Sequence, residues 1–167
     1  MKVLSVDITV DYGPGKQVLT DVGFELSAGE TLGVIGRSGS GKSTLAMSLL
    51  GLLDRRRART RGRILLGTDD ILLMKDRDLR RVRGKRIGLV LQAAASALNP
   101  HLRLATHIRE AWRAHATCDW SAAKGQVIDT LRRLDLECDE AFLRRYPGEI
   151  SVGQAQRVLI AMAVLHK

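Results

Sequence analysis

The sequence predicts an α/β fold in which a β-rich N-terminal part leads into a helical part. Polar and apolar residues alternate over 1–10 and 18–26, which is typical of half-buried strands. A glycine-rich loop at 36–43 separates a short apolar stretch from a stretch with helical spacing. From about residue 93 onward the apolar residues recur at helical intervals, so the elements change character along the chain.

The β-rich part follows from alternation, apolar runs and turn residues. The stretch 31–35 is short and mostly apolar, as expected for a strand at the centre of a sheet. Glycine, proline or aspartate interrupts the pattern in three places, and turns are expected at 11–16, 28–30 and 67–70. The predicted strands are 1–10, 18–26, 31–35, 62–66 and 86–91.

Helices are expected where apolar residues recur every three or four positions. The first such segment has a broad apolar face, and the second is short and polar. A Pro147-Gly148 turn precedes the last of them. The predicted helices are 43–53, 76–82, 104–115, 121–134 and 151–165.

The composition is that of an ordinary globular protein, with 45% hydrophobic and 27% charged residues. No apolar run approaches the roughly 18 residues that a membrane span needs, and the N-terminus lacks the layout of a signal peptide. These features predict a cytoplasmic protein that reaches a membrane only through a partner. Cys118 and Cys138 have no metal-ligand spacing around them and are expected to be free thiols.

The net charge of +9 raises the question of a nucleic-acid partner. The positive charge is clustered, with six arginines between Arg55 and Arg63 and a second run from Arg77 to Arg86. Stacking on bases needs aromatic side chains, and neither run has aromatics interleaved with it. We interpret the runs as solvated basic surface facing phosphates or lipid headgroups, and expect no nucleic-acid partner.

The loop sequence G-R-S-G-S-G-K-S fits the phosphate-binding pattern G-x-x-x-x-G-K-[ST]. Glycines let backbone N–H groups turn toward an anion, and the following helix adds the positive end of its dipole. Lys42 is expected to contact the β- and γ-phosphates, and the Ser43 hydroxyl to ligate Mg²⁺. A purely structural glycine turn would need neither side chain. The expected nucleotide-binding residues are Gly36, Ser38, Gly39, Ser40, Gly41, Lys42, Ser43 and Thr44.

Three further segments resemble the ATP-binding subunits of ABC transporters. The stretch 86–91 ends at Gln92 and is similar to the Q-loop of that family, which the resemblance places near Mg²⁺ and the attacking water. The sequence I-S-V-G-Q at 150–154 is similar to the family signature L-S-G-G-Q, with Val152 in place of the usual first glycine. Tyr12 stands where the family has an aromatic residue that stacks on adenine.

The signature resemblance implies that Ser151, Gly153 and Gln154 contact the γ-phosphate of a nucleotide held by the opposite subunit. Serine is also a favoured helix N-cap, which is the structural alternative for Ser151. The β-branched side chain of Val152 could crowd the phosphate, but we expect the motif to remain usable. Four histidines precede the position of the family's switch histidine and are expected on the surface or on helix faces: His101, His107, His115 and His166.

Within the family, four short segments resemble the oligopeptide and dipeptide importers, whose relatives also serve nickel. They are Arg83–Ile87, Leu98–Pro100, Tyr146-Pro147 and Ile160–Ala163. The resemblance implies ATP and Mg²⁺ as cofactors and import of a solute, with peptides as the expected cargo. It also implies transmembrane permease subunits and a second ATP-binding subunit as partners, with the chain peripheral on the inner face of the cell membrane.

The resemblance ends with the signature helix. The Walker B aspartate, the catalytic glutamate, the D-loop and the switch histidine of the family have no counterpart, so we expect an incomplete ABC-type P-loop NTPase domain. Its expected parts are a β subdomain with part of the nucleotide-binding core at 1–92, a helical subdomain at 93–150 and the signature helix at 151–167. The alternatives are a catalytically inactive nucleotide-binding fragment and an ABC-type DNA-repair ATPase. No heptads and no Cys-x-x-Cys lie between Lys42 and Ser151, which favours the transporter.

Overall fold

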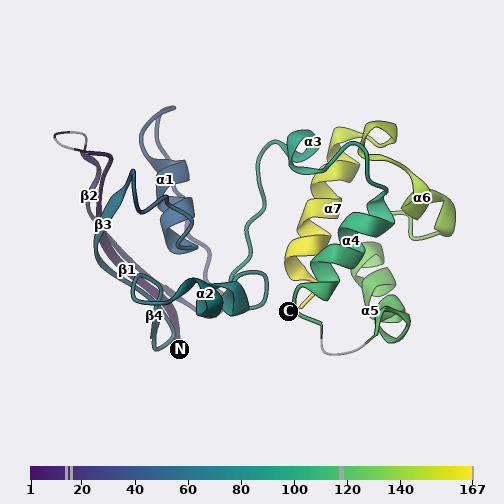
Figure 1. Ribbon diagram of the computed structural model, residues 1–167, viewed down its shortest axis with the longest axis horizontal. Coiled ribbons are helices and arrows are strands. Elements are labelled where there is room, and N and C mark those ends of the chain that lie inside the picture. The colour runs from purple at the N-terminus through teal and green to yellow at the C-terminus, as the bar shows by residue number, and fades with distance from the viewer. Residues whose placement is uncertain (14, 16, 117–118, 167) are drawn as a thin grey trace. The chain divides into compact units, whose positions relative to one another are not determined.

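The computed structural model describes residues 1–13, 15, 17–116 and 119–166. The chain forms two compact units, Met1–Leu79 and Arg80–Lys167, each with its own hydrophobic core (Figure 1). Cys118 and part of the predicted 11–16 turn lie outside the described residues, whereas Cys138 is half-buried with a free thiol.

The first unit is built on an antiparallel sheet with the strand order β2-β1-β3-β4. The predicted strands 1–10 and 18–26 are confirmed, and 62–66 is the C-terminal part of a longer strand. Two residues of the predicted 67–70 turn form a short fourth strand, which hydrogen-bonds to β3. The strands are β1 (Lys2–Asp11), β2 (Gln17–Ser27), β3 (Arg59–Leu66) and β4 (Asp69–Asp70).

One face of this sheet is apolar because every second residue of β1 points into the core. Val6 lies opposite Phe24 of β2 and Ile64 of β3, so the apolar positions of three strands coincide. Helix α1 (Lys42–Leu49) packs on this face, where Leu45 lines an apolar groove together with side chains of β1 and β2. The buried residues of β1 are Leu4, Val6, Ile8 and Val10.

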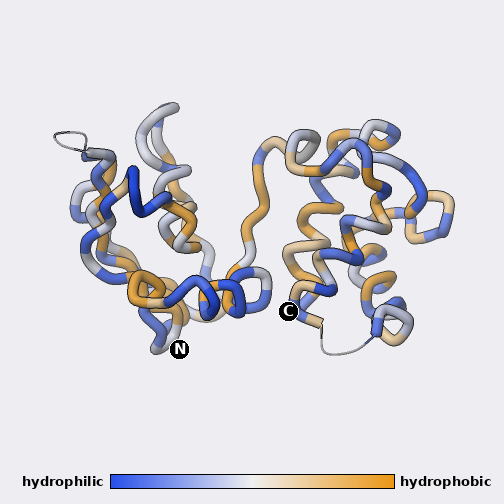
Figure 2. The backbone as a smooth tube through the Cα atoms, in the orientation of Figure 1, coloured by the Kyte–Doolittle hydropathy of each residue, from blue (hydrophilic) through white to orange (hydrophobic). Residues whose placement is uncertain are grey.

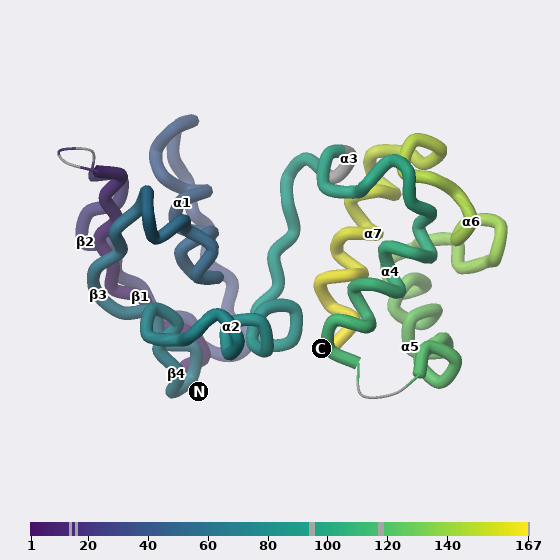
Figure 3. The backbone as a smooth tube through the Cα atoms, viewed as in Figure 1, coloured from purple at the N-terminus to yellow at the C-terminus, as the bar shows by residue number. Residues whose placement is uncertain are grey.

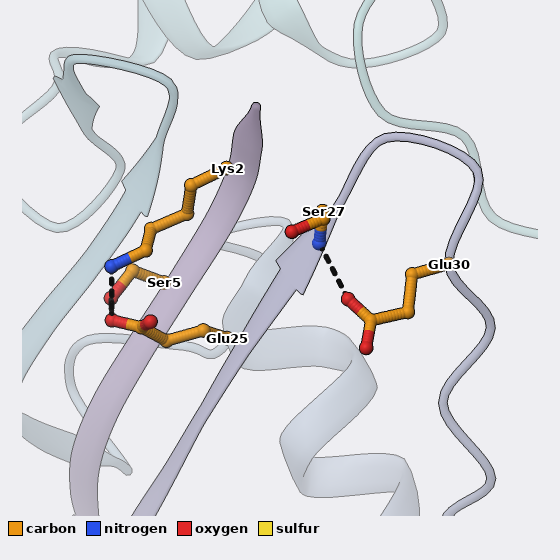
Figure 4. A network of polar contacts seen from close by, with 5 residues as sticks. All are labelled: Lys2, Ser5, Glu25, Ser27 and Glu30. Carbon is orange, nitrogen blue, oxygen red and sulfur yellow. Dashed lines mark hydrogen bonds and ion pairs between the residues drawn. The ribbon is translucent and has the colours of Figure 1, made fainter.

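The opposite face of the sheet carries polar contacts that fix the ends of β1 and β2 (Figure 4). The Lys2 ammonium and the Ser5 hydroxyl both donate to the Glu25 carboxylate, and the bond from Lys2 holds the pKa of that carboxyl below its usual value. The backbone N–H of Ser27 donates to Glu30 at 2.7 Å. That bond closes the predicted 28–30 turn, which directs the chain toward the glycine-rich loop.

Two predicted strands are wrong, because neither 31–35 nor 86–91 forms a strand in the structure. A buried strand needs hydrogen-bonded neighbours, and the described residues supply none to 31–35. Ile35 is 98% exposed as a result. In the second unit, 86–91 forms only an isolated bridge between Arg83 and Ile87.

Helix positions follow the periodicity closely. The helix predicted at 43–53 ends at Leu49, because Leu50 caps it and Gly51 adopts a positive φ of 61°. The 76–82 prediction is confirmed as α2 (Asp76–Val82). The predictions for 104–115, 121–134 and 151–165 are confirmed as α4 (Leu104–Arg113), α5 (Trp120–Arg133) and α7 (Val152–Val164).

Two short helices were not predicted, α3 (Ala94–Ala97) and α6 (Glu140–Arg144). The second is defined by its cap: the Asp139 carboxylate accepts from the Phe142 N–H at 2.7 Å, and Phe142 is fully buried. The predicted Pro147-Gly148 turn is part of a short 3₁₀ helix, η1 (Pro147–Glu149).

The second unit is a helical bundle whose core lies between α4, α5, α6 and α7, and hydrophobic residues run along α7 in Figure 2. His107 lies on the buried face of α4 with its Nε2 3.1 Å from the Asn99 carbonyl oxygen, and His166 stacks on Trp112. The largest fully buried side chains of the second unit are Leu104, Ile108, Leu131, Phe142, Val158 and Leu165.

Over the described residues, no helix combines the length and the apolar character that a membrane crossing requires.

Gly62 is expected to be essential for pairing β1 with β3. It has a φ of 102°, and a Cβ there would collide with the Asp7 carbonyl oxygen of the neighbouring strand. Gly62→Ala should therefore destabilise the first unit by about 1–3 kcal/mol or more. Urea unfolding followed by circular dichroism measures this. The matched control is Gly125→Ala in α5, where a Cβ meets nothing within 4 Å; that change should stabilise by about 0.5–1 kcal/mol. Equal unfolding midpoints for the two variants would contradict the analysis.

Candidate nucleotide-binding site

The glycine-rich loop directly before α1 has a backbone that only glycine accommodates well. Gly39 and Gly41 have φ values of 79° and 92°, in the left-handed region that side chains disfavour. A Cβ on Gly36 would lie 2.6 Å from the Ser40 Oγ, and one on Gly41 would lie 2.7 Å from a methyl carbon of Leu19 in β2. The loop is thus tightly curled and packed against the sheet, at the N-terminal end of α1 in Figure 3.

Lys42 closes this loop from inside. Its ammonium donates to the Gly36 carbonyl oxygen at 2.7 Å and to the Arg37 carbonyl oxygen at 2.8 Å. The backbone adds a turn bond from Ser40 N–H to the Arg37 carbonyl at 3.2 Å. One positive charge is therefore held over the concave side of the loop.

The start of α1 is open to an anion. Gly41 is the N-cap and has no side chain to satisfy the first N–H groups of the helix, and its carbonyl accepts from Leu45 N–H at 2.8 Å. The first turn contains no acidic residue, Ser43 is exposed and Thr44 is half-buried. Free N–H groups, a lysine and an exposed hydroxyl together match what a phosphate requires.

The segment 150–154 forms the beginning of α7 in the second unit. Ser151 is the N-cap: its Oγ accepts from Gln154 N–H at 3.1 Å, and its own N–H donates to the Gln154 side-chain oxygen at 2.9 Å. The capping alternative raised by the sequence is thus realised. Because the hydroxyl oxygen acts as acceptor in this pair, its proton remains available for a further acceptor such as a phosphate oxygen.

Val152 does not block this helix start. Its side chain is 75% exposed, and Ser151 and Gly153 on either side are also exposed. A Cβ on Gly153 would meet no heavy atom closer than the Ser151 Oγ at 4.0 Å. The N-terminal surface of α7 is therefore accessible around the valine.

Gln92 is exposed and follows the irregular stretch 86–91. That stretch lies along α7, because the Gln156 side chain donates to the Leu91 carbonyl at 3.3 Å and a Cβ on Gly88 would approach the Ala163 carbonyl to 3.0 Å. Sequence reasoning assigned no role to Gln156, although its place two residues after the signature pattern was the available signal.

Arg157 has a similar positioning role beside Gln156. Its guanidinium donates to the carbonyls of Leu134 and Asp135 at 3.3 and 2.9 Å, just after the end of α5. These carbonyls end a helix and have no intrahelical partners, so the arginine satisfies groups that would otherwise need water. The Gln-Arg pair therefore fixes α7 against two neighbouring segments.

The expected site residues fall into two groups. The structure brings the loop residues 36–44 together in the first unit, and Ser151, Gly153 and Gln154 together in the second, where Gln92 also lies. Tyr12 is half-buried just after β1, and its ring makes no aromatic or cation–π contact with a described residue.

The fold and the loop define a P-loop protein with a separate helical unit. The family model described as "ABC transporter" matches residues 19–167. The chain therefore belongs to the ABC transporter family. Tyr12 lies before the matched residues.

Two similar proteins are named as transport ATP-binding proteins. The dipeptide transport ATP-binding protein DppD of Bacillus subtilis is 36% identical over 169 residues, covering 98% of this chain and 50% of DppD. The oligopeptide transport ATP-binding protein OppD of the same organism is 34% identical over 154 residues, covering 92% and 43%. The chain spans about half the length of the curated relatives it matches.

Solved structures of ATP-binding cassettes share the fold. The cassette MJ0796, in a dimeric post-hydrolysis state bound to ADP and Pi, superposes with a TM-score of 0.80 at 25% identity. The match covers 98% of this chain and 69% of MJ0796. An ATP-binding subunit of an ABC transporter gives a TM-score of 0.74 at 26% identity, covering 98% and 62%. The predicted ABC-type fold class is thereby confirmed.

The capping box predicts how the start of α7 responds to mutation. Ser151→Ala removes the acceptor for Gln154 N–H and should lower the free energy of unfolding by about 1 kcal/mol. Ser151→Asn keeps a side-chain oxygen at the cap and should cost much less. Urea unfolding of the three proteins, followed by circular dichroism, tests the ranking. If the asparagine variant lost as much stability as the alanine variant, the hydroxyl would not be acting as a cap.

Proposed function

We propose that this chain is part of the ATP-binding component of an ABC importer and binds ATP through the loop at 36–44. The observation that carries the proposal is the loop itself. Its glycines adopt left-handed or crowded conformations, and Lys42 is held over its concave side. Conformation and charge at the start of α1 both favour a bound phosphate chain.

Individual roles follow from position. Lys42 neutralises the β- and γ-phosphates, and the N–H groups of the loop from Gly39 to Thr44 surround them. The residues 38 and 40 are serines whose exposed hydroxyls border the same loop. We assign Tyr12 to stacking on the adenine base, as the family resemblance implies.

The same loop fits Mg²⁺ as a companion of the nucleotide. The described residues contain no group of three or more His, Cys, Asp or Glu side chains that could hold a metal ion. Mg²⁺ usually keeps several waters and is held by substrate phosphates with few protein ligands, which a single exposed hydroxyl can satisfy. We assign Ser43 as a ligand and Gln92 as a second one; the ion would neutralise charge on the phosphates.

We also propose that the chain acts as a pair. Ser151, Gly153 and Gln154 present a hydroxyl proton and open N–H groups at the start of a helix, which suits an anion held by another subunit. MJ0796 forms a dimer bound to ADP and Pi, which supports this arrangement. The partner is a second ATP-binding subunit, of the same or a different sequence.

Peptides are the proposed cargo. Transmembrane partner subunits would form the permease, and this chain would bind to them on the inner face of the membrane. DppD and OppD, which are named for dipeptide and oligopeptide transport, support this choice. The coupling would convert ATP binding and hydrolysis in the complete subunit into solute import. In this arrangement, two ATP-binding subunits form a sandwich with the nucleotides between them, and each subunit binds a transmembrane permease subunit.

A second candidate function is nucleotide binding without hydrolysis by the 167-residue polypeptide. The last acidic residue in the sequence is Glu149, and no carboxylate follows the signature segment. In-line attack on the γ-phosphate needs a group that orients the water and a carboxylate that supports the metal. Ser43 and Gln92 supply only part of that set.

Nucleotide affinity should depend on Lys42. Lys42→Ala removes the loop's charged donor and should weaken binding of a fluorescent ATP analogue by at least about tenfold, since charge-assisted bonds to phosphate are the strong ones. Lys75→Ala, an exposed lysine in the same unit, is the charge-matched control and should bind as the unaltered chain does. Equal affinity of the Lys42 and Lys75 variants, both with unchanged circular dichroism, would refute the assignment.

The 167-residue polypeptide itself should show only background phosphate release with Mg-ATP. The residues that we assign to the nucleotide and its metal include no carboxylate to polarise the attacking water. A phosphate-release assay over a range of protein concentrations tests this, with Lys42→Ala as the blank. A steady rate on the order of 1 s⁻¹ that vanished in the blank would show that these residues contain a general base that we have not identified.

A further inference from the structure

A cavity of about 300 Å³ lies within the helical unit, between α4, α5 and α6. It involves none of the residues of the glycine-rich loop, the Q-loop or the signature segment. All of its lining residues belong to the second compact unit. Nothing in the proposed nucleotide chemistry uses it.

The floor of the cavity is apolar. Ile108 of α4 and Val127 of α5 are buried side chains of the hydrophobic core that also line the cavity. Ile128, Leu143 and the indole ring of Trp120 add half-buried apolar surface. A ligand with a compact hydrocarbon or aromatic body would bury that body here and gain from the removal of apolar surface from water.

The rim of the cavity is cationic. Arg144 is paired with Glu140, the only acidic residue of the lining, at 2.6 Å. Arg103, Arg109 and Lys124 also line the cavity, and within the described ranges none of the three forms an ion pair. Three positive charges without a carboxylate partner thus converge on one apolar hollow.

Two of these cations are held on aromatic rings. The Arg109 guanidinium lies over the Trp120 ring, 5.5 Å from its centroid, which joins α4 to the first residue of α5 at the rim. Arg103 lies over the Tyr146 ring in a similar way at 5.7 Å. Guanidinium groups held on aromatic rings keep their N–H edges available for a carboxylate or a phosphate.

We propose that this cavity is a binding site for a small amphipathic anion, a ligand with an apolar body and a single carboxylate or phosphate group. The apolar body occupies the floor between α4 and α5, and the anionic group lies at the rim between Arg109 and Lys124. A solvated basic surface would spread its charges over convex helix faces. Here the unpaired cations surround a concave apolar site. A ligand is therefore stabilised both by burial of its apolar body and by attraction of its anionic group to the cations. The site is independent of nucleotide binding.

The test uses the 167-residue chain and two probes of equal chain length, decanoate and decyl phosphate. Binding is measured by isothermal titration calorimetry and by the fluorescence of Trp120, which lines the cavity, while Trp112 is buried elsewhere. We expect saturable 1:1 binding of at least one probe, weakened by added salt because the contact is electrostatic. Decyl phosphate binding alone identifies a phosphate site, and decanoate binding alone identifies a carboxylate site.

The decisive variant is the double substitution Arg109→Gln/Lys124→Gln, which should weaken binding of the anion by at least tenfold. Its matched control is Arg113→Gln/Arg133→Gln, which removes the same charge from the same two helices at positions outside the lining. The control, and Lys42→Ala, should bind the probe as the unaltered chain does. All of these side chains except Lys42 are exposed, and circular dichroism would check that each variant is folded.

Three results would overturn the proposal. The first is no saturable binding of either probe at low millimolar concentration. The second is equal weakening by the rim variant and by the control, which would show a general effect of net charge. The third is binding of neutral decanol as tight as that of both anions, which would show an apolar hollow without anion recognition.

Discussion

The close approach of the glycine-rich loop to β2 is the constraint on which the proposed nucleotide site depends. A Cβ on Gly41 would lie 2.7 Å from a methyl carbon of Leu19 and 3.1 Å from the Val18 carbonyl oxygen, and the φ of 92° at this position further disfavours a side chain. This contact fixes the point where the chain leaves the loop and enters α1. Leu45, one turn later, then packs on the apolar face of the sheet. The direction of α1, and with it the direction of its first N–H groups, therefore follows from a packing contact.

In the helical unit, hydrogen bonds hold the start of α7 in place. The first residues of α7, which we propose contact a nucleotide, are exposed and so contribute little burial of their own. The capping box between Ser151 and Gln154 holds their backbone, and the next turn is tied down by Gln156 and Arg157. Val158, the next residue, is fully buried. The exposed first turn of α7 is thus held in place by hydrogen bonds and by the buried residue that follows it.

Local sequence predicted the elements that depend on local patterns. Alternation located β1 and β2, helical spacing located α4, α5 and α7, and the P-loop and signature patterns located the candidate site residues. It failed for 31–35 and 86–91, because whether an apolar run is a strand depends on partners elsewhere in the fold. It also missed the groups that hold the site in place. Leu19 beside Gly41 is a contact between segments far apart in sequence, which no single-segment pattern contains.

The hydrogen bonds of Lys42 indicate how the loop can both keep its shape and accept a nucleotide. The ammonium donates to two neutral carbonyl oxygens, Gly36 and Arg37, which hold it near the concave side. A phosphate oxygen is a charged acceptor, and hydrogen bonds to charged acceptors are roughly twice as strong as those to neutral ones. In the proposed nucleotide complex, a phosphate oxygen would therefore be a stronger acceptor for this ammonium than either carbonyl. The curvature of the loop backbone also rests on its glycines, because Gly39 and Gly41 have left-handed φ values and a Cβ on Gly36 would crowd Ser40.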